Sequence, residues 1–158
     1  MIYPFEIRFK KKLNVSPTIN SHEVMSFISK AVTQGSPYLK NKKVTNNQFS
    51  FKVDFWGVGR GSDFDGVSKG TFTLDHENNG MILSFVYRIG SNMIIFPFIF
   101  VIPMLIVLFT DYERFLSTAP MLFAVTIGGE LLFWFATLFK MNRIFRRMVR
   151  LVEANWAL

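Results

Sequence analysis

The stretch APMLFAVTIGGELLFWFATLF, residues 119–139, determines how the rest of the chain must be interpreted. About 20 apolar residues in a helix cross about 30 Å of hydrocarbon, and this stretch has that length and composition. A second stretch, MIIFPFIFVIPMLIVLF at residues 93–109, has no polar side chain and reaches the same length when the preceding residues are included. The sequence therefore predicts a two-helix transmembrane hairpin at residues 89–139, with spans at about 89–110 and 119–139.

The distribution of charge predicts the orientation of this hairpin. Residues 1–88 carry 12 Lys and Arg against 7 Asp and Glu, and residues 140–158 carry 5 against 1. The connector TDYERFLST carries one Arg against two acids. Lys and Arg are enriched in cytoplasmic segments next to membrane spans. We therefore expect a multi-pass protein of the inner membrane, with both termini in the cytoplasm.

Residues 1–88 are predicted to form a small α+β domain. Apolar and polar residues alternate as in half-buried strands, at residues 3–10, 48–56, 70–76 and 81–88. Asn20 and Glu23 resemble a capping box at the start of a helix, SHEVMSFISKAVTQ, that Gly35 ends. We expect the order β-α-β-β-β, an antiparallel sheet covered by one helix, with the basic segment YLKNKKVTNN as a loop. The last strand is apolar on both faces, so it is central or its outer face meets another subunit or the bilayer.

The glycine-rich segment GVGRGSDFDGVSKG, residues 57–70, suggests a loop that binds an anionic small molecule through Arg60 and Lys69. A phosphate-binding loop normally opens a helix whose N-terminus faces the anion, whereas a strand is predicted to follow this one. A hairpin loop without a ligand is therefore the alternative interpretation.

The residues that catalysis requires are scarce. The chain has no cysteine and two histidines, and it lacks the spacing of a metal site, a Walker loop or a nucleophile elbow. We expect a non-enzymatic protein with no catalytic residue, no metal and no cofactor. A nucleic-acid partner is not expected either, because the aromatic residues of the strands lie on the face that the helix must cover.

The second span has two different faces. Ala124 and Gly128 are four residues apart, which lets another helix approach closely. At 100° per residue, Thr126, Glu130 and Thr137 fall within about 40° of each other on roughly the opposite side. This thin polar stripe is the predicted intramembrane or pore-lining site.

Glu130 has no charge partner nearby in its own chain. Lys140 is about 15 Å away at 1.5 Å per residue, and the first span has no polar side chain between Asn92 and Thr110. Acids inside membranes face protein or water-filled cavities. Three solutions remain: a protonated carboxyl bonded to a backbone carbonyl or Thr126, a ring of Glu130 residues in an oligomer, or a basic residue of another protein.

The tail KMNRIFRRMVRLVEANW is a basic amphipathic helix, with contact to anionic lipid expected through its basic side chains, which are Lys140, Arg143, Arg146, Arg147 and Arg150. We expect it at the membrane surface. The alternative is a straight extension of the second span that packs against the soluble domain.

The layout resembles that of bacterial membrane effectors, in which a soluble sensor binds a signal and the spans then assemble and permeabilise the bilayer. This likeness concerns layout only. The function expected is a cytoplasmic sensor or interaction domain that controls self-assembly of the hairpin into a homo-oligomer that forms a pore or permeabilises the membrane. The alternative is an accessory or scaffold subunit of a larger inner-membrane complex.

Overall fold

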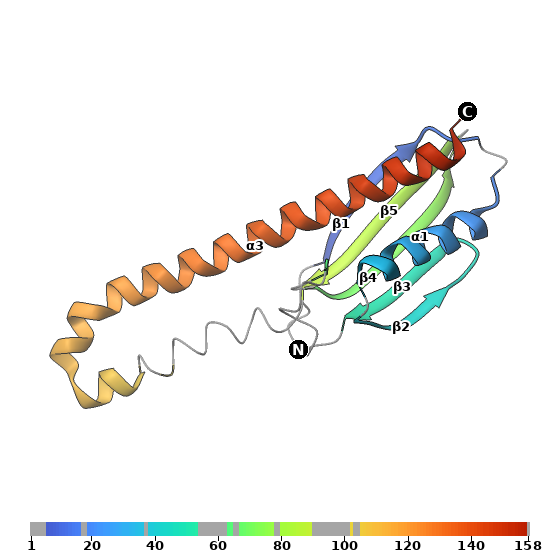
Figure 1. Ribbon diagram of the computed structural model, residues 1–158. Coiled ribbons are helices and arrows are strands. Elements are labelled where there is room, and N and C mark those ends of the chain that lie inside the picture. The colour runs from blue at the N-terminus through green and yellow to red at the C-terminus, as the bar shows by residue number, and fades with distance from the viewer. Residues whose placement is uncertain are drawn as a thin grey trace. The chain divides into compact units, whose positions relative to one another are not determined.

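The computed structural model describes residues 6–16, 19–36, 38–53, 63–64, 67–77, 80–89, 102 and 105–157. Its elements are labelled in Figure 1 and follow in the order β1 (Glu6–Leu13), α1 (Ser21–Gly35), β2 (Leu39–Val44), β3 (Gln48–Val53), β4 (Val67–Glu77), β5 (Gly80–Ile89) and α3 (Tyr112–Trp156). The chain divides into two compact units, one made of Met1–Gly90 with Lys140–Leu158 and the other of Ser91–Phe139.

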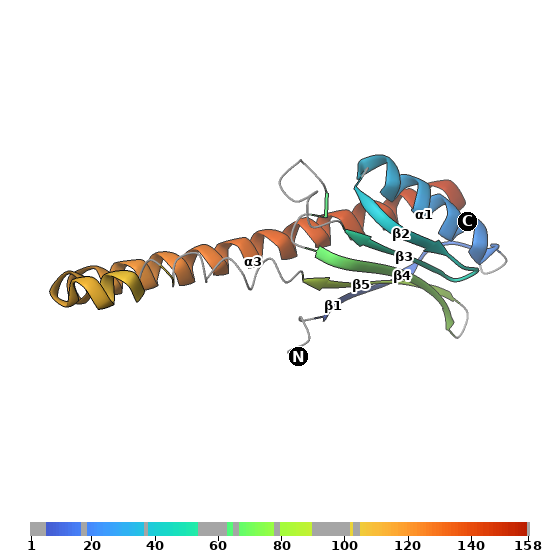
Figure 2. The same cartoon turned by 90° about the horizontal axis from the view of Figure 1, so that it is seen from below.

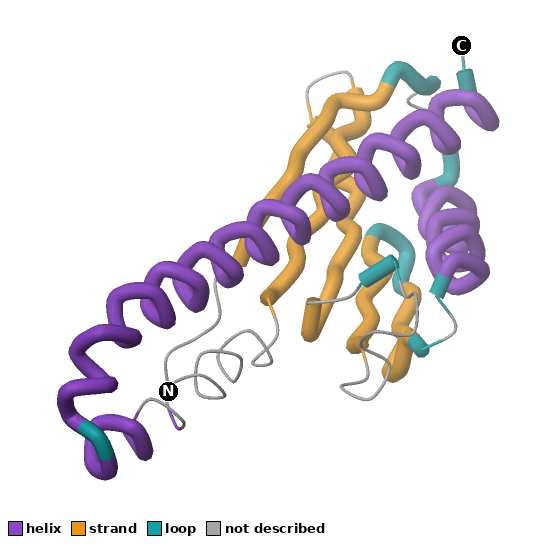
Figure 3. The backbone as a smooth tube through the Cα atoms, turned by 60° about the vertical axis from the view of Figure 1, so that its left-hand side comes forward, coloured by secondary structure: helices purple, strands orange, loops and turns teal. Residues whose placement is uncertain are grey.

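The first unit contains a five-stranded antiparallel sheet in the order β1-β5-β4-β3-β2, whose strands are drawn in orange in Figure 3. The first strand of the sequence, β1, pairs along its full length with Met81–Arg88 of the last strand, β5. β5 lies between β1 and β4, so the prediction of a central strand is confirmed.

The strand β2 corrects the prediction of a basic loop at YLKNKKVTNN. Its residues lack an alternating pattern because both faces are largely in water at the edge of the sheet. The register shifts between Lys40 and Lys43, and Asn41 has a φ of 49°. Lysines and bulges are the usual features of an edge strand that avoids pairing with other chains.

The predicted helix is confirmed in α1. The side chain of Asn20 accepts a hydrogen bond of 3.0 Å from the backbone N–H of His22, which satisfies one of the free donors at the helix start. Gly35 is its last residue. Its buried apolar residues, which pack on β2, β3 and β4, are Val24, Met25, Ile28 and Val32.

The last part of α3 packs on the same face of the sheet as α1 (Figure 2). The ring of Phe145 stacks on that of Phe9 in β1 at 5.8 Å, and Trp156 meets Phe27 of α1 edge-on at 5.2 Å. Its buried residues are Met141, Phe145, Met148, Val149 and Val152. Of the two arrangements predicted for residues 140–158, the structure has the extension that packs against the domain. The apolar face is therefore not inserted among lipid headgroups, and the sheet is covered by two helices rather than one.

The core is built from phenylalanine rings on neighbouring strands. Phe72 and Phe85 stack at 4.2 Å, and Phe49 stacks on Phe72 at 6.4 Å. The ring of Phe51 lies over Gly70 on β4, directly opposite it in the sheet. Because glycine has no Cβ, Gly70 leaves the space that this ring fills.

In the second unit, residues 119–139 lie within α3, which is long and apolar enough to cross a membrane. Residues 105–110 are helical, and most of the first predicted span lies outside the described residues. Apolar side chains such as Met121, Leu132 and Phe139 are 72–74% exposed in the chain by itself. Such a surface is suited to lipid or to other helices rather than to water.

Gly70→Ala is expected to lower the free energy of unfolding by about 1–3 kcal/mol, the range for overpacking a core. The added Cβ would lie 2.3 Å from Cζ of Phe51, whose ring is buried and has no room to move. The measurement is urea unfolding of the full chain in detergent.

Gly80→Ala is the matched control for this prediction. Its Cβ would meet the flexible end of the Lys12 side chain, which is exposed and can move into solvent. We expect a change within about 0.5 kcal/mol, the range for surface substitutions. Equal destabilisation by the two variants would contradict the account of the Phe51 ring.

Candidate functional site: the faces of α3 and the basic surfaces

One face of α3 is less exposed than the rest of the helix over most of its length. Its residues recur at intervals of three or four, and they are Thr126, Glu130, Trp134, Thr137, Met141, Phe145, Met148 and Val152. This spacing places them on one side of an α-helix. The predicted polar stripe thus lies in phase with the side of α3 that is buried against the sheet in the first unit.

The polar stripe itself is partly withdrawn from solvent. Thr137 is 4% exposed, and Oε1 of Glu130 is buried without a hydrogen-bond partner in the described part of the chain. Thr126 is half-buried. A buried polar oxygen without a partner is destabilising by about 1–3 kcal/mol. The three solutions predicted for Glu130 stay predictions.

The small-residue face of α3 is open. Ala124 is exposed, and a Cβ built on Gly128 would meet no atom within 4 Å. The same holds for Gly129. The structure therefore leaves room at Gly128 for the close approach of another helix.

The basic residues of the tail lie away from the sheet. Lys140 is half-buried, and the others, Arg143, Arg146, Arg147 and Arg150, are exposed. Their contact with anionic lipid stays a prediction, and it involves only the polar side of the helix because the apolar side is covered.

The predicted anionic-ligand pair is described only in part, since Arg60 lies outside the described residues. Lys69 is exposed and belongs to β4 rather than to a loop. It lies directly opposite Arg88 on one side and Lys52 on the other. Sequence reasoning missed this grouping, because strand register brings together residues that are far apart in the chain.

A groove of about 540 Å³ lies between α1 and the last part of α3. Phe27, Val32, Phe64 and Met148 contribute apolar surface to it. The charged residues that line it are Lys30, Asp63 and Arg147. With two cations and one acid, the groove has no strong preference for a ligand of either charge.

Ionisable groups that suit catalysis or metal binding do not gather in the described part of the chain. His76 contacts the hydroxyl of Ser21 at 2.9 Å near the start of α1. Among the described residues, no three His, Cys, Asp or Glu side chains lie together in a way that holds a metal ion. The predictions of no catalytic residue and no cofactor stay predictions.

Tyr87 is a buried polar residue in the core of the first unit. Its ring stacks between Phe9 and Phe85, and its hydroxyl has no hydrogen-bond partner among the described residues. Burial raises the pKa of Tyr87 from 10.0 to about 12, because the phenolate is poorly solvated there.

Comparisons with known proteins identify no family for this chain. No model of a known protein family matches the chain. No curated protein matches it either. Among solved structures, the chain is similar to the solution NMR structure of a polyketide-cyclase-like protein from Corynebacterium glutamicum, with 12% identity over 96% of this chain and 94% of that one and a TM-score of 0.37. This likeness is too distant to bear on activity.

The natural protein is expected to lose stability at alkaline pH because of Tyr87, and Tyr87→Phe should not show this loss. The folded-state pKa is raised, so the contribution of the neutral phenol is complete below pH 10.0 and is lost as the pH rises toward about 12. Unfolding free energies of both proteins would be measured across this pH range. Below pH 10 the variant should be as stable as the natural protein or more so, by about 1 kcal/mol, since an unpartnered buried hydroxyl is removed. An identical alkaline decline in both proteins would contradict the assignment to Tyr87.

Proposed function

We propose that this chain is a non-enzymatic inner-membrane protein whose cytoplasmic domain controls the self-assembly of a two-helix hairpin, in the manner of a pore-forming or permeabilising effector. Residues 89–110 and 119–139 are the two spans, and the sheet with α1 and residues 140–157 is the cytoplasmic domain. The observation that carries the proposal is the composition of α3. A helix of the membrane type continues into a segment whose apolar face is buried in the core of the folded domain.

The continuity of α3 supports coupling between domain and spans. The helix extends from Tyr112 to Trp156, so it passes from the apolar segment into the domain without a loop. At the other connection, β5 ends at Ile89, where the first span is predicted to begin. In this proposal, a change in the domain at residues 140–156 acts on the second span through this one helix. Rigid elements of this kind are a physical means of coupling distant sites.

The two faces of residues 119–139 support separate roles. Glu130 lies on the side in phase with the buried face, which suits a hydrogen-bonded contact with the first span of the same chain. Ala124 and Gly128 lie on the open side, which suits another copy of the chain. In this arrangement assembly uses the small-residue face, and Glu130 becomes pore-lining only if the hairpins rearrange.

Gly128→Ile is expected to weaken self-association by about tenfold, the equivalent of 1.4 kcal/mol, because the side chain fills the space needed by a neighbouring helix. Gly129→Ile is the matched control. It makes the same change one residue away, about 100° around the helix, where a Cβ also meets open space. Native mass spectrometry of protein extracted gently from lipid would give the oligomer distribution. Equal effects of both variants would argue against the proposed face.

Glu130→Gln and Glu130→Ala test the pore. If Glu130 lines a conducting path, both variants should lower membrane conductance in liposomes, and Gln should keep the oligomer size because it preserves the hydrogen-bonding capacity. If conductance and oligomer size are both unchanged, the pore version is wrong. A stoichiometric complex with a different polypeptide, in the same mass spectra, would support the accessory-subunit alternative.

A further inference from the structure

Four cationic side chains form a row across the open face of the sheet, opposite the face covered by α1 and α3. Arg88 of β5 lies opposite Lys69 of β4, which lies opposite Lys52 of β3, which lies opposite Lys40 of β2. Directly opposed residues in an antiparallel pair point to the same side of the sheet. Lys40, Lys52 and Lys69 are exposed.

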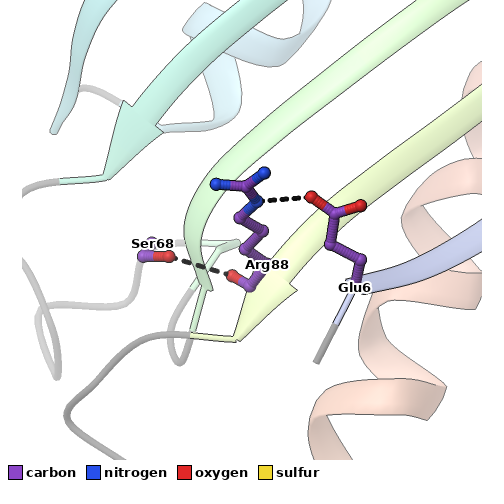
Figure 4. Close-up of polar contacts among 3 residues, drawn as sticks. All are labelled: Glu6, Ser68 and Arg88. Carbon is purple, nitrogen blue, oxygen red and sulfur yellow. Dashed lines mark hydrogen bonds and ion pairs between the residues drawn. The ribbon is translucent and has the colours of Figure 1, made fainter. Parts of the chain in front are cut away.

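The Arg88 end of this row is paired with an acid. Nε of Arg88 donates to Oε1 of Glu6 in β1 at 2.5 Å, and Ser68 Oγ donates to the backbone oxygen of Arg88, as Figure 4 shows. Glu6 therefore balances the Arg88 end of the row. The adjacent row adds Arg8 and Lys43 at its two ends, with Val86, Thr71 and Ser50 between them. The acids Asp75 and Glu77 lie at the opposite end of β4.

The basic row lies at the end of the sheet from which both connections to the apolar segment leave. β5 ends at Ile89, one residue after Arg88. α3 runs parallel to β1, because Phe145 stacks on Phe9 whereas Ala157 bridges to Val15. Lys140, five residues before Phe145, therefore lies toward the Glu6 end of β1, which is also the Arg88 end of β5.

Like charges placed directly opposite each other in a sheet are destabilising. The free energy of such a row falls when an anionic surface lies against it. The open face offers Ser, Thr and Val between the cations, while the aromatic rings Phe49, Phe72 and Phe85 are buried on the other face. A platform for stacking nucleic-acid bases is thus absent from the described open face. A polyanionic surface is the partner that this chemistry fits.

We propose that this row, Lys40, Lys52, Lys69 and Arg88, is a docking surface for the anionic headgroups of the membrane leaflet that the chain enters. It holds the cytoplasmic domain against the bilayer in one orientation. The inference rests on the proposed membrane anchoring, because the two covalent connections are what bring this end of the sheet to the lipid. Basic residues near an anionic leaflet contribute about 1 kcal/mol each.

The test is acylation of lysines in the full chain, reconstituted in nanodiscs of phosphatidylcholine alone or mixed with phosphatidylglycerol, and read residue by residue by mass spectrometry. Lys52 and Lys69 should react about fivefold more slowly in the mixed discs, the equivalent of about 1 kcal/mol, and high salt should abolish the difference. Lys12, at the other end of the open face, and Lys30, on α1, are internal controls that should not change.

Paired variants provide a second readout. Lys52→Gln with Lys69→Gln should reduce the phosphatidylglycerol retained per chain after extraction, whereas the matched pair Lys10→Gln with Lys12→Gln should retain more of it. Both pairs of substitutions remove two positive charges from the open face. If lipid retention depended only on net charge, the two double variants would therefore lose equal amounts of phosphatidylglycerol.

Several outcomes would overturn the docking surface. They are equal reactivity of Lys52 and Lys69 in the two discs, equal lipid loss in the two variant pairs, or the same protection in phosphatidylcholine discs by inorganic phosphate or by a short single-stranded RNA. Failure of the chain to enter either disc would overturn the proposed membrane anchoring as well. Entry without protection would overturn the docking surface alone.

Discussion

One side of α3 is less exposed than the others from Thr126 to Val152, and it is fully buried in the last part of the helix; the rest of the structure depends on that constraint. Residues three or four apart lie on the same side of an α-helix. Other parts of the protein therefore have to cover this side over most of the length of the helix. In the last part of α3 the covering is the sheet, through Phe9 and its neighbours. In the apolar part the same side carries the carboxyl group of Glu130, and moving a carboxyl group from water into hydrocarbon without a hydrogen-bond partner costs free energy.

This constraint explains why the domain has two helices on one face. α1 covers β2, β3 and β4, which leaves the inner face of β1 and β5 in need of cover. The last turns of α3 provide it, and the edge-on contact of Trp156 with Phe27 joins the two helices. The domain is therefore built from the two ends of the sequence, with the apolar segment inserted between them. Both ends of the apolar segment, residues 91–139, are therefore joined to the same domain. This connection suits the predicted hairpin, whose two ends would lie on the same side of the membrane.

The two ends of the sheet differ in the charged residues that they carry. The end of the sheet next to both connections carries the cationic row, while Asp75 and Glu77 lie at the other end. Four of the basic side chains of residues 1–88 are thus aligned at one end of the sheet. Ser84, Tyr87 and Glu130 are the described residues in which a buried polar atom lacks a hydrogen-bond partner. Tyr87 stays neutral in an aromatic core, whereas Glu130 lies in a segment suited to contact with further helices.

The sequence by itself determined the elements whose signals are local. Period-two alternation located β3, β4 and β5, the Asn20 cap located the start of α1, and apolar length located the membrane-type segment in α3. The edge strand β2 was missed, because a strand with solvent on both faces has no alternating pattern. The basic amphipathic pattern of the tail also fits two environments, since a lipid surface and a phenylalanine-rich sheet both accept an apolar helix face. Only the tertiary structure decided between them, and only strand register aligned Lys40, Lys52, Lys69 and Arg88. The reason is that register and helix docking depend on contacts between residues far apart in the chain, which no local pattern encodes.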